Sequence, residues 1–286
     1  MGFIDVIKER ARANKKVIVL PETEDRRTYE ATAQILKEGI ADVVLVGSEE
    51  AVRKGSEGLD ITGAVIVDPA TSDKTQAYVD KLVELRSKKG MTPEQAREIL
   101  LNQYLYYGVM MVKMGDADGM VSGACPSTAD TLRPCLQILK TKPGTKLVSA
   151  FFLMVVPDCE YGANGTFVFA DSGLNQNPTP EELAAIAASS AESFKLLVEE
   201  PVVAMLSHST KGSAKHADVD KVVEATRIAK EQNPELKLDG EFQLDAAIVP
   251  SVGASKAPGS EVAGKANTLI FPDLDAGNIG YKLVQR

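Results

Sequence analysis

The stretch from Asp116 to Pro134, DADGMVSGACPSTADTLRP, brings small residues, hydroxyl side chains and an arginine into one short span. A short apolar strand there ends in a small-residue loop and opens into a helix that Ser127 or Thr128 is placed to cap. The first N–H groups of a helix lack intrahelical partners and lie at its positive end. Arg133 adds a planar cation suited to phosphate. The pattern predicts an anion site, and a plain capped helix with a surface arginine is the alternative.

A second loop of this character follows the apolar run Val202–Leu206. Its sequence, SHSTKGS, offers a point charge for phosphate at Lys211 and hydroxyl donors at Ser209 and Thr210. Ligands bind α/β sheets at the carboxyl ends of the strands. We therefore expect these side chains to line a binding site, with a solvated strand–helix turn as the alternative.

A third loop follows the apolar run Thr268–Phe271. Gly277 would let the backbone approach a ligand closely, and Asn278 is placed to cap a helix. The chain has neither a GxGxxG nor a GxxxxGK[ST] motif, which disfavours dinucleotide oxidoreduction and a P-loop.

Composition narrows the possible partners. The net charge of −8 over 286 residues argues against nucleic acid. Three cysteines without CxxC spacing and only two histidines predict neither a disulfide framework nor a metal site. No apolar run reaches the ~18 residues that span a bilayer, and the N-terminus lacks a signal peptide, so we expect no membrane association and a cytoplasmic location.

Elements that position these loops alternate between helix and strand along the chain. Short continuous apolar runs bounded by Gly, Pro or Asp are typical of strands covered by helices on both faces, which predicts an α/β fold with doubly wound parallel sheets. Strands are expected at 16–20, 43–46, 65–67, 147–155, 166–170, 202–206 and 268–271, with helices at 27–39, 72–88, 92–101, 102–114, 181–198 and 218–232.

The basic, turn-rich segment Lys140–Gly144 is the candidate linker. It predicts a first domain over residues 1–143 and a second over 144–286, whose regular elements start at Lys146. The stretch Ser251–Gly264 has few bulky apolar residues and is expected to be an exposed loop, with the lining of a cleft as the alternative.

Five stretches together resemble the phosphate acetyltransferase (phosphotransacetylase) family, and the similarity extends over the whole chain. Pro126 stands where family members usually have His, while the Ser-Thr-x-x-x-x-Arg frame is intact. The stretches are SGACPSTADTLRP, MLSHSTKGSAK, DGEFQLDAAIVP, KAPGS and FPDLDAGNIGYK.

The resemblance implies reversible acetyl transfer between acetyl phosphate and coenzyme A, giving acetyl-CoA and phosphate. It implies two α/β/α domains with the active site in a cleft between them, in an architecture like that of isocitrate/isopropylmalate dehydrogenases. It also implies a homodimer with no tightly bound cofactor, and with coenzyme A as a substrate. A phosphate butyryltransferase and a non-catalytic acyl-CoA-sensing domain of malic-enzyme type are the alternatives.

Residue roles follow from the same resemblance. Arg133, Ser127 and Thr128 are expected at the reacting centre. Arg86 matches a family arginine implicated in coenzyme A or phosphate binding, with a surface arginine on a helix as the alternative. The other expected substrate-binding residues are Ser209, Thr210, Lys211, Gly277 and Asn278.

The family carries a further segment with an Asn-Asp-Leu-Ser-Arg-Gly motif and a later Asp proposed as the base for the coenzyme A thiol. This sequence ends at Arg286, before such a motif. We therefore expect the first domain to be completed by a C-terminal tail absent here, and the 286-residue chain alone to be poorly active.

Overall fold

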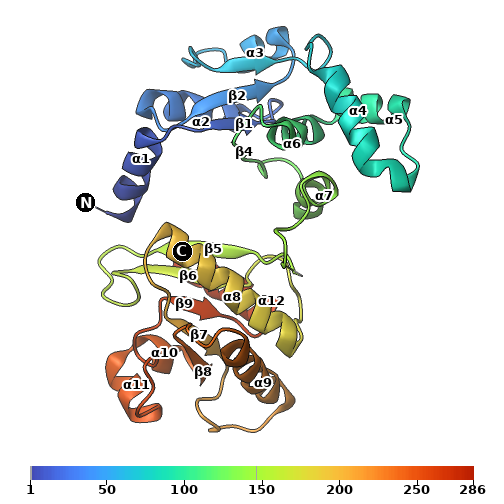
Figure 1. Ribbon diagram of the computed structural model, residues 1–286. Coiled ribbons are helices and arrows are strands. Elements are labelled where there is room, and N and C mark those ends of the chain that lie inside the picture. Colours follow the sequence, from blue (N-terminus) through green and yellow to red (C-terminus); the bar gives the residue numbers. More distant parts are fainter. Residues whose placement is uncertain (1, 146) are drawn as a thin grey trace. The chain divides into compact units, whose positions relative to one another are not determined.

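The computed structural model describes residues 2–145 and 147–286. The chain divides into two compact units, the first ending at Lys140 and the second beginning at Thr141. In Figure 1 the first unit runs from blue to green and the second from yellow-green to red. The predicted start of the second set of elements, Lys146, lies outside the described residues.

The first unit is built around a parallel sheet with the strand order β3-β2-β1-β4. Its sequence-based strands and helices are confirmed to within a few residues at their ends. The elements are α1 Phe3–Ala13, β1 Val17–Leu20, α2 Arg26–Glu38, β2 Asp42–Val46, α3 Glu49–Gly55, β3 Val65–Val67, α4 Thr75–Arg86, the 3₁₀ turn Ser87–Lys89, α5 Pro93–Asn102, α6 Tyr104–Met114, β4 Gly119–Met120 and α7 Thr128–Ile138.

Both faces of this sheet are covered, because successive residues of a strand point to opposite sides. Val44 and Val46 of β2 belong to the core formed with α4, α5 and α6, whereas Val43 and Leu45 belong to the core under α2 and α3. The continuous apolar run of β2 is therefore the consequence of two helical layers.

The second unit holds a five-stranded sheet of order β5-β6-β9-β7-β8. Core clusters again lie on both faces, with Val168 and Met205 on the side of α8 and α9, and Phe169 and Leu269 on the opposite side. The elements are β5 Phe151–Val155, β6 Thr166–Ala170, α8 Pro180–Leu197, β7 Val203–Leu206, α9 Ala217–Gln232, β8 Leu238–Phe242, α10 Leu244–Ile248, α11 Pro250–Lys256, β9 Thr268–Ile270 and α12 Leu274–Gln285.

The prediction of purely parallel sheets is wrong for the second unit, where β5 pairs with β6 in antiparallel register. The two strands are joined by a short turn-rich segment in which Asp158, Gly162, Asn164 and Gly165 have positive φ. So short a connection can only return the chain antiparallel, since a parallel pair needs a longer crossover.

Three other predictions need correction. The strand expected from residue 147 begins only at Phe151. Strand β8 was not expected, because Asp239 and Glu241 interrupt its apolar pattern. The stretch expected to be an exposed loop contains most of α11, and Val262 is buried in the core beneath it.

Candidate active site

Helix α7 starts as the sequence predicts, with Ser127 as its N-cap. The Ser127 hydroxyl accepts a hydrogen bond from the Asp130 N–H at 3.2 Å and donates one to the Asp130 carboxylate at 2.7 Å. Thr128 is the first helical residue and is exposed. Ser127 therefore fixes the start of the helix that carries Arg133.

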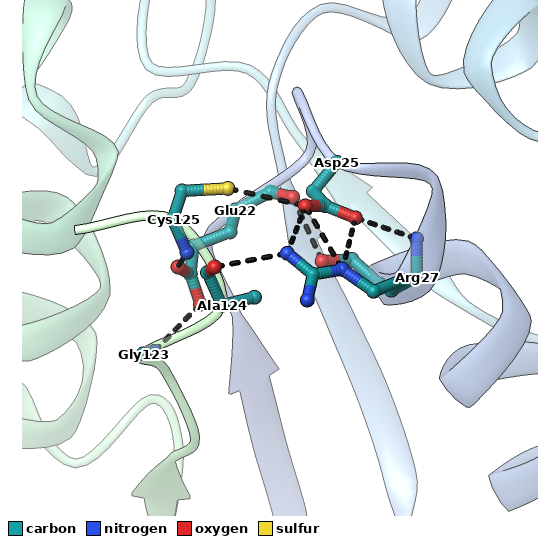
Figure 2. A network of polar contacts seen from close by, with 7 residues as sticks. Glu22, Asp25, Arg27, Gly123, Ala124 and Cys125 are labelled. Atoms are coloured by element: carbon teal, nitrogen blue, oxygen red, sulfur yellow. Dashed lines mark hydrogen bonds and ion pairs between the residues drawn. The ribbon is translucent and has the colours of Figure 1, made fainter.

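The loop before this helix is held by Glu22, which the sequence analysis did not single out. The Glu22 carboxylate accepts the Gly123 N–H at 2.8 Å and the Cys125 N–H at 2.7 Å (Figure 2). Arg27 donates to the Ala124 carbonyl at 2.9 Å. Two of the loop N–H groups thus already have an anion, supplied by the chain itself.

Charges around this loop make the Cys125 thiol a poor nucleophile. Burial raises its pKa, and the hydrogen bond to Asp25 and the negative charges of Glu24, Asp25 and Glu22 raise it further. The thiolate, which is the reactive form, is therefore disfavoured near neutral pH.

A pocket of 770 Å³ lies against this loop in the first unit. The Arg133 side chain reaches it with 57% of its surface exposed, and its ion pair with Asp130 spans 3.3 Å. Side chains from four segments converge on the pocket, among them Glu22, Tyr104, Tyr106, Cys125, Asp130 and Arg133.

Arg133 and Arg86 act on the same phenol. Burial raises the pKa of Tyr106, and the positive charges of Arg133 and Arg86 lower it in opposition. The Nε of Arg86 is buried and finds no hydrogen-bond partner within residues 2–145 and 147–286. Two arginines far apart in sequence therefore lie within electrostatic range of one pocket residue.

In the second unit, Lys211 is already paired with protein groups. Its ammonium lies 2.8 Å from Asp239 and donates to the Gly240 carbonyl at 2.6 Å. Lys230 and Ser260 complete the shell of Asp239 at 2.6 and 2.7 Å. Burial raises the pKa of Asp239, but these donors outweigh it and lower that pKa to about 2. Lys211 is therefore a partner of a buried carboxylate.

Ser209 and Thr210 are buried within the same loop. The Ser209 hydroxyl donates to Glu241 at 2.8 Å, and the Gly212 N–H donates to the same carboxylate oxygen at 2.7 Å. The Thr210 hydroxyl accepts the Gln243 N–H at 2.9 Å. These hydroxyls hold the loop against the end of β8.

The prediction that Asn278 caps a helix is wrong, since α12 is capped by Asp273, which accepts the Ala276 N–H at 2.9 Å. Asn278 lies inside the helix and donates to the Ser172 carbonyl at 3.4 Å. Gly277 packs so closely that an added Cβ would lie 2.4 Å from the Asp171 carbonyl oxygen. The close approach that Gly277 permits is thus to the chain itself.

Among the described residues, no group of three or more His, Cys, Asp or Glu is arranged to hold a metal ion. No helix within residues 2–145 and 147–286 combines the length and apolar character needed to cross a membrane.

Residues 2–286 match the family model described as "Phosphate acetyl/butaryl transferase". The chain belongs to the phosphate acetyl/butaryl transferase family. The phosphate acetyltransferase of Acetivibrio thermocellus is 58% identical over 287 residues, which cover 100% of this chain and 86% of that relative. The phosphate acetyltransferase of Bacillus subtilis is 46% identical over 99% of this chain and 86% of its own length.

A solved structure titled "EutD phosphotransacetylase from Staphylococcus aureus" is similar with a TM-score of 0.90 and 43% identity, covering 99% of this chain and 86% of that one. The family membership and the α/β class inferred from sequence are confirmed. The family relatives give no support to the expectation of a missing catalytic segment, because the chain covers 86% of their length. The dehydrogenase-like architecture and the cleft between domains stay predictions.

Proposed function

We propose that this chain is a phosphate acetyltransferase, which moves an acetyl group reversibly between acetyl phosphate and coenzyme A. The observation that carries the proposal is the 770 Å³ pocket of the first unit, which Arg133 and Tyr106 line. The positive charges of Arg133 and Arg86 both act on Tyr106. Relatives at 46–58% identity bearing the name phosphate acetyltransferase support it.

The chemistry asks for concentrated positive charge. The thiol of coenzyme A loses its proton, the thiolate attacks the acetyl carbonyl, and the bond to phosphate breaks as phosphate leaves. Guanidinium groups bind phosphate oxygens in a forked geometry and stabilise charge that develops on them. In our proposal Arg133 and Arg86 bind the phosphoryl group or the adjacent part of coenzyme A.

The remaining predicted site residues take roles that follow from their contacts. Ser127 and Thr128 set the start of α7 and present its first turn to the substrate. The loop of Ser209, Thr210 and Lys211 is proposed to contribute to substrate binding through its shape and its exposed edge. Its polar side chains already form hydrogen bonds or ion pairs with protein groups.

Gly277 and Asn278 are proposed to act through the packing of α12 against the Asp171–Ser172 segment. We also propose that the enzyme works as a homodimer without a tightly bound cofactor, which light scattering and absorbance spectra of the purified protein would test.

Acetyl and butyryl transfer are separated by a direct comparison. The purified chain is given coenzyme A with acetyl phosphate or butyryl phosphate, and thioester formation is followed by ultraviolet absorbance. A methylene group contributes about 1–3 kcal/mol of discrimination, so we expect kcat/KM to be at least about tenfold higher for acetyl phosphate. Higher kcat/KM for butyryl phosphate would contradict the acetyl assignment in favour of the family's other activity.

A further inference from the structure

Glu22 lies just beyond the end of β1 and is only 5% exposed. Strand β4 pairs with β1, and Val121, the residue that follows β4, donates its N–H to the Val19 carbonyl at 3.0 Å. Beyond that point Gly123 adopts a φ of 128°, and the loop departs from the strand direction. The two oxygens of Glu22 then take the Gly123 and Cys125 N–H groups, so a side chain continues the pairing that the backbone gives up.

A carbonyl group of the same loop is also bound. Arg27 donates to the Ala124 carbonyl at 2.9 Å, and Asp25 fixes Arg27 with an ion pair of 2.6 Å. Figure 2 shows the Glu22 carboxylate at the Gly123 and Cys125 N–H groups and the Arg27 guanidinium at the Ala124 carbonyl. We call Glu22, Asp25 and Arg27, with residues 123–125, the loop clamp.

The loop clamp is joined to the pocket by a short path. Cys125 is followed by Pro126 and then by Ser127, the N-cap of α7, and Arg133 lies on that helix. Glu22 and Cys125 also line the pocket that Arg133 enters. A shift of the loop would move the first turn of α7 and the base of Arg133 with it, because proline restricts the backbone between them.

We propose that Glu22 is a positioning residue, whose carboxylate holds the 123–125 loop so that α7 presents Arg133 to the substrate phosphate. The proposal rests on the proposed function. It also assigns the Gly123 and Cys125 N–H groups to Glu22 as their resident anion, so that phosphate is bound by the arginine side chains.

The ionisation of Glu22 agrees with this role. Burial raises its pKa, but the N–H groups of Cys125, Gly123 and Ala124 and the Ser122 hydroxyl together lower the pKa below its usual value. A charged carboxylate accepts stronger hydrogen bonds than a neutral amide. A glutamine in its place would also turn an NH₂ group toward one of the loop donors, so that one of the two contacts is lost.

The test is a double-mutant cycle in the full chain, with Glu22→Gln, Arg133→Ala and the double variant assayed on acetyl phosphate and coenzyme A. Glu22→Gln alone should lower kcat/KM by about tenfold or more, the scale of a lost hydrogen bond to a charged group. In the Arg133→Ala background, Glu22→Gln should lower kcat/KM by less than about threefold, because the effects of two residues that act through one another are not additive. The change in Glu22→Gln should divide between KM and kcat as it does in Arg133→Ala.

Asp116→Asn is the matched control. Asp116 is a carboxylate just before β4, at the end away from the pocket, where it accepts the Tyr78 hydroxyl at 2.6 Å and pairs with Lys74. Asp116→Asn should lower the midpoint of thermal unfolding while kcat/KM stays within about twofold, since Asp116 precedes β4, whereas the 123–125 loop follows it, and Asp116 does not line the pocket. The same cycle with Glu22→Asp, which keeps the charge but shortens the reach, carries the test if Glu22→Gln fails to fold.

Wild-type kcat/KM in a folded Glu22 variant would overturn the inference while leaving the proposed function intact. An undiminished loss in the Arg133→Ala background would also overturn it, because Glu22 would then act independently of Arg133. A wild-type chain without transferase activity would refute the proposed function, and the inference with it.

Discussion

Replacing Arg133 by alanine separates binding from stability because of where this side chain lies. Arg133 is 57% exposed and makes one i,i+3 ion pair, to Asp130 at 3.3 Å. Exposed helical pairs of this kind contribute about 0.2–0.5 kcal/mol, and alanine is the best helix former. The free energy of unfolding should therefore fall by at most about 0.5 kcal/mol, which lowers the midpoint of thermal unfolding by about 2 °C.

The effect on activity should be far larger. A charge-assisted hydrogen bond to phosphate contributes about 1.5–3 kcal/mol, which corresponds to a fall in kcat/KM of about 10- to 150-fold. Steady-state rates of thioester formation, with acetyl phosphate and coenzyme A each varied, measure this fall. Arg133→Lys is the matched variant, because it keeps the charge and loses the planar fork. Its kcat/KM should lie between those of wild type and Arg133→Ala. A kcat/KM for Arg133→Ala within about twofold of wild type would refute the assignment.

Two further predictions concern the loops that frame the site. Ser127→Ala removes the N-cap of α7 and should lower the free energy of unfolding by about 0.5–2 kcal/mol, measured by urea denaturation; an unchanged midpoint would show that the cap contributes nothing. Asp239→Asn should destabilise the chain by about 1.5–3 kcal/mol at pH 6, because Lys211 and Lys230 lose their shared carboxylate. The pKa of Asp239 is about 2 in the folded chain and about 3.9 when unfolded, so this stabilisation is complete above about pH 5 and is lost as pH falls toward 2. The difference between wild type and Asp239→Asn should therefore shrink at pH 3, and a constant difference would contradict the pairing.

Local sequence signals predicted local structure well. The helix expected at 92–101 forms as α5, which begins with a reciprocal capping pair of Thr92 and Gln95, and Ser127 caps α7. The apolar runs mark most of the strands, because helices cover both faces of each sheet. Arg133 lines a pocket of the first unit, and its role in binding an anion stays a prediction.

Contacts between distant segments were not predictable in the same way. Glu22 meets Gly123 across 101 residues, and nothing in the local sequence PETED distinguishes a buried glutamate from the exposed one that follows it. Strand β8 has the sequence LDGEF, whose Asp, Gly and Glu are typical of a turn. Only the contacts of Asp239 and Glu241 with distant residues show that these carboxylates belong to a buried strand. One signal could have drawn attention to Glu22. It lies two residues after the end of β1, and β1 pairs with β4, the strand that leads into the 123–125 loop.

The same limit explains the polar loop of the second unit. Lys211, Ser209 and Thr210 have the residue types of a phosphate site, yet each contacts a residue of β8 or just after it. Hydroxyls and ammonium groups satisfy buried carboxylates as readily as they satisfy a ligand, and residue type alone does not distinguish the two.

The central claim, acetyl transfer between phosphate and coenzyme A, is tested most directly by isotope exchange. Radiolabelled inorganic phosphate is incubated with unlabelled acetyl phosphate and the purified chain, with and without coenzyme A. Label should enter acetyl phosphate only when coenzyme A is present, because the exchange passes through acetyl-CoA. Absence of exchange in a chain that still binds acetyl-CoA would contradict the account and indicate a binding protein.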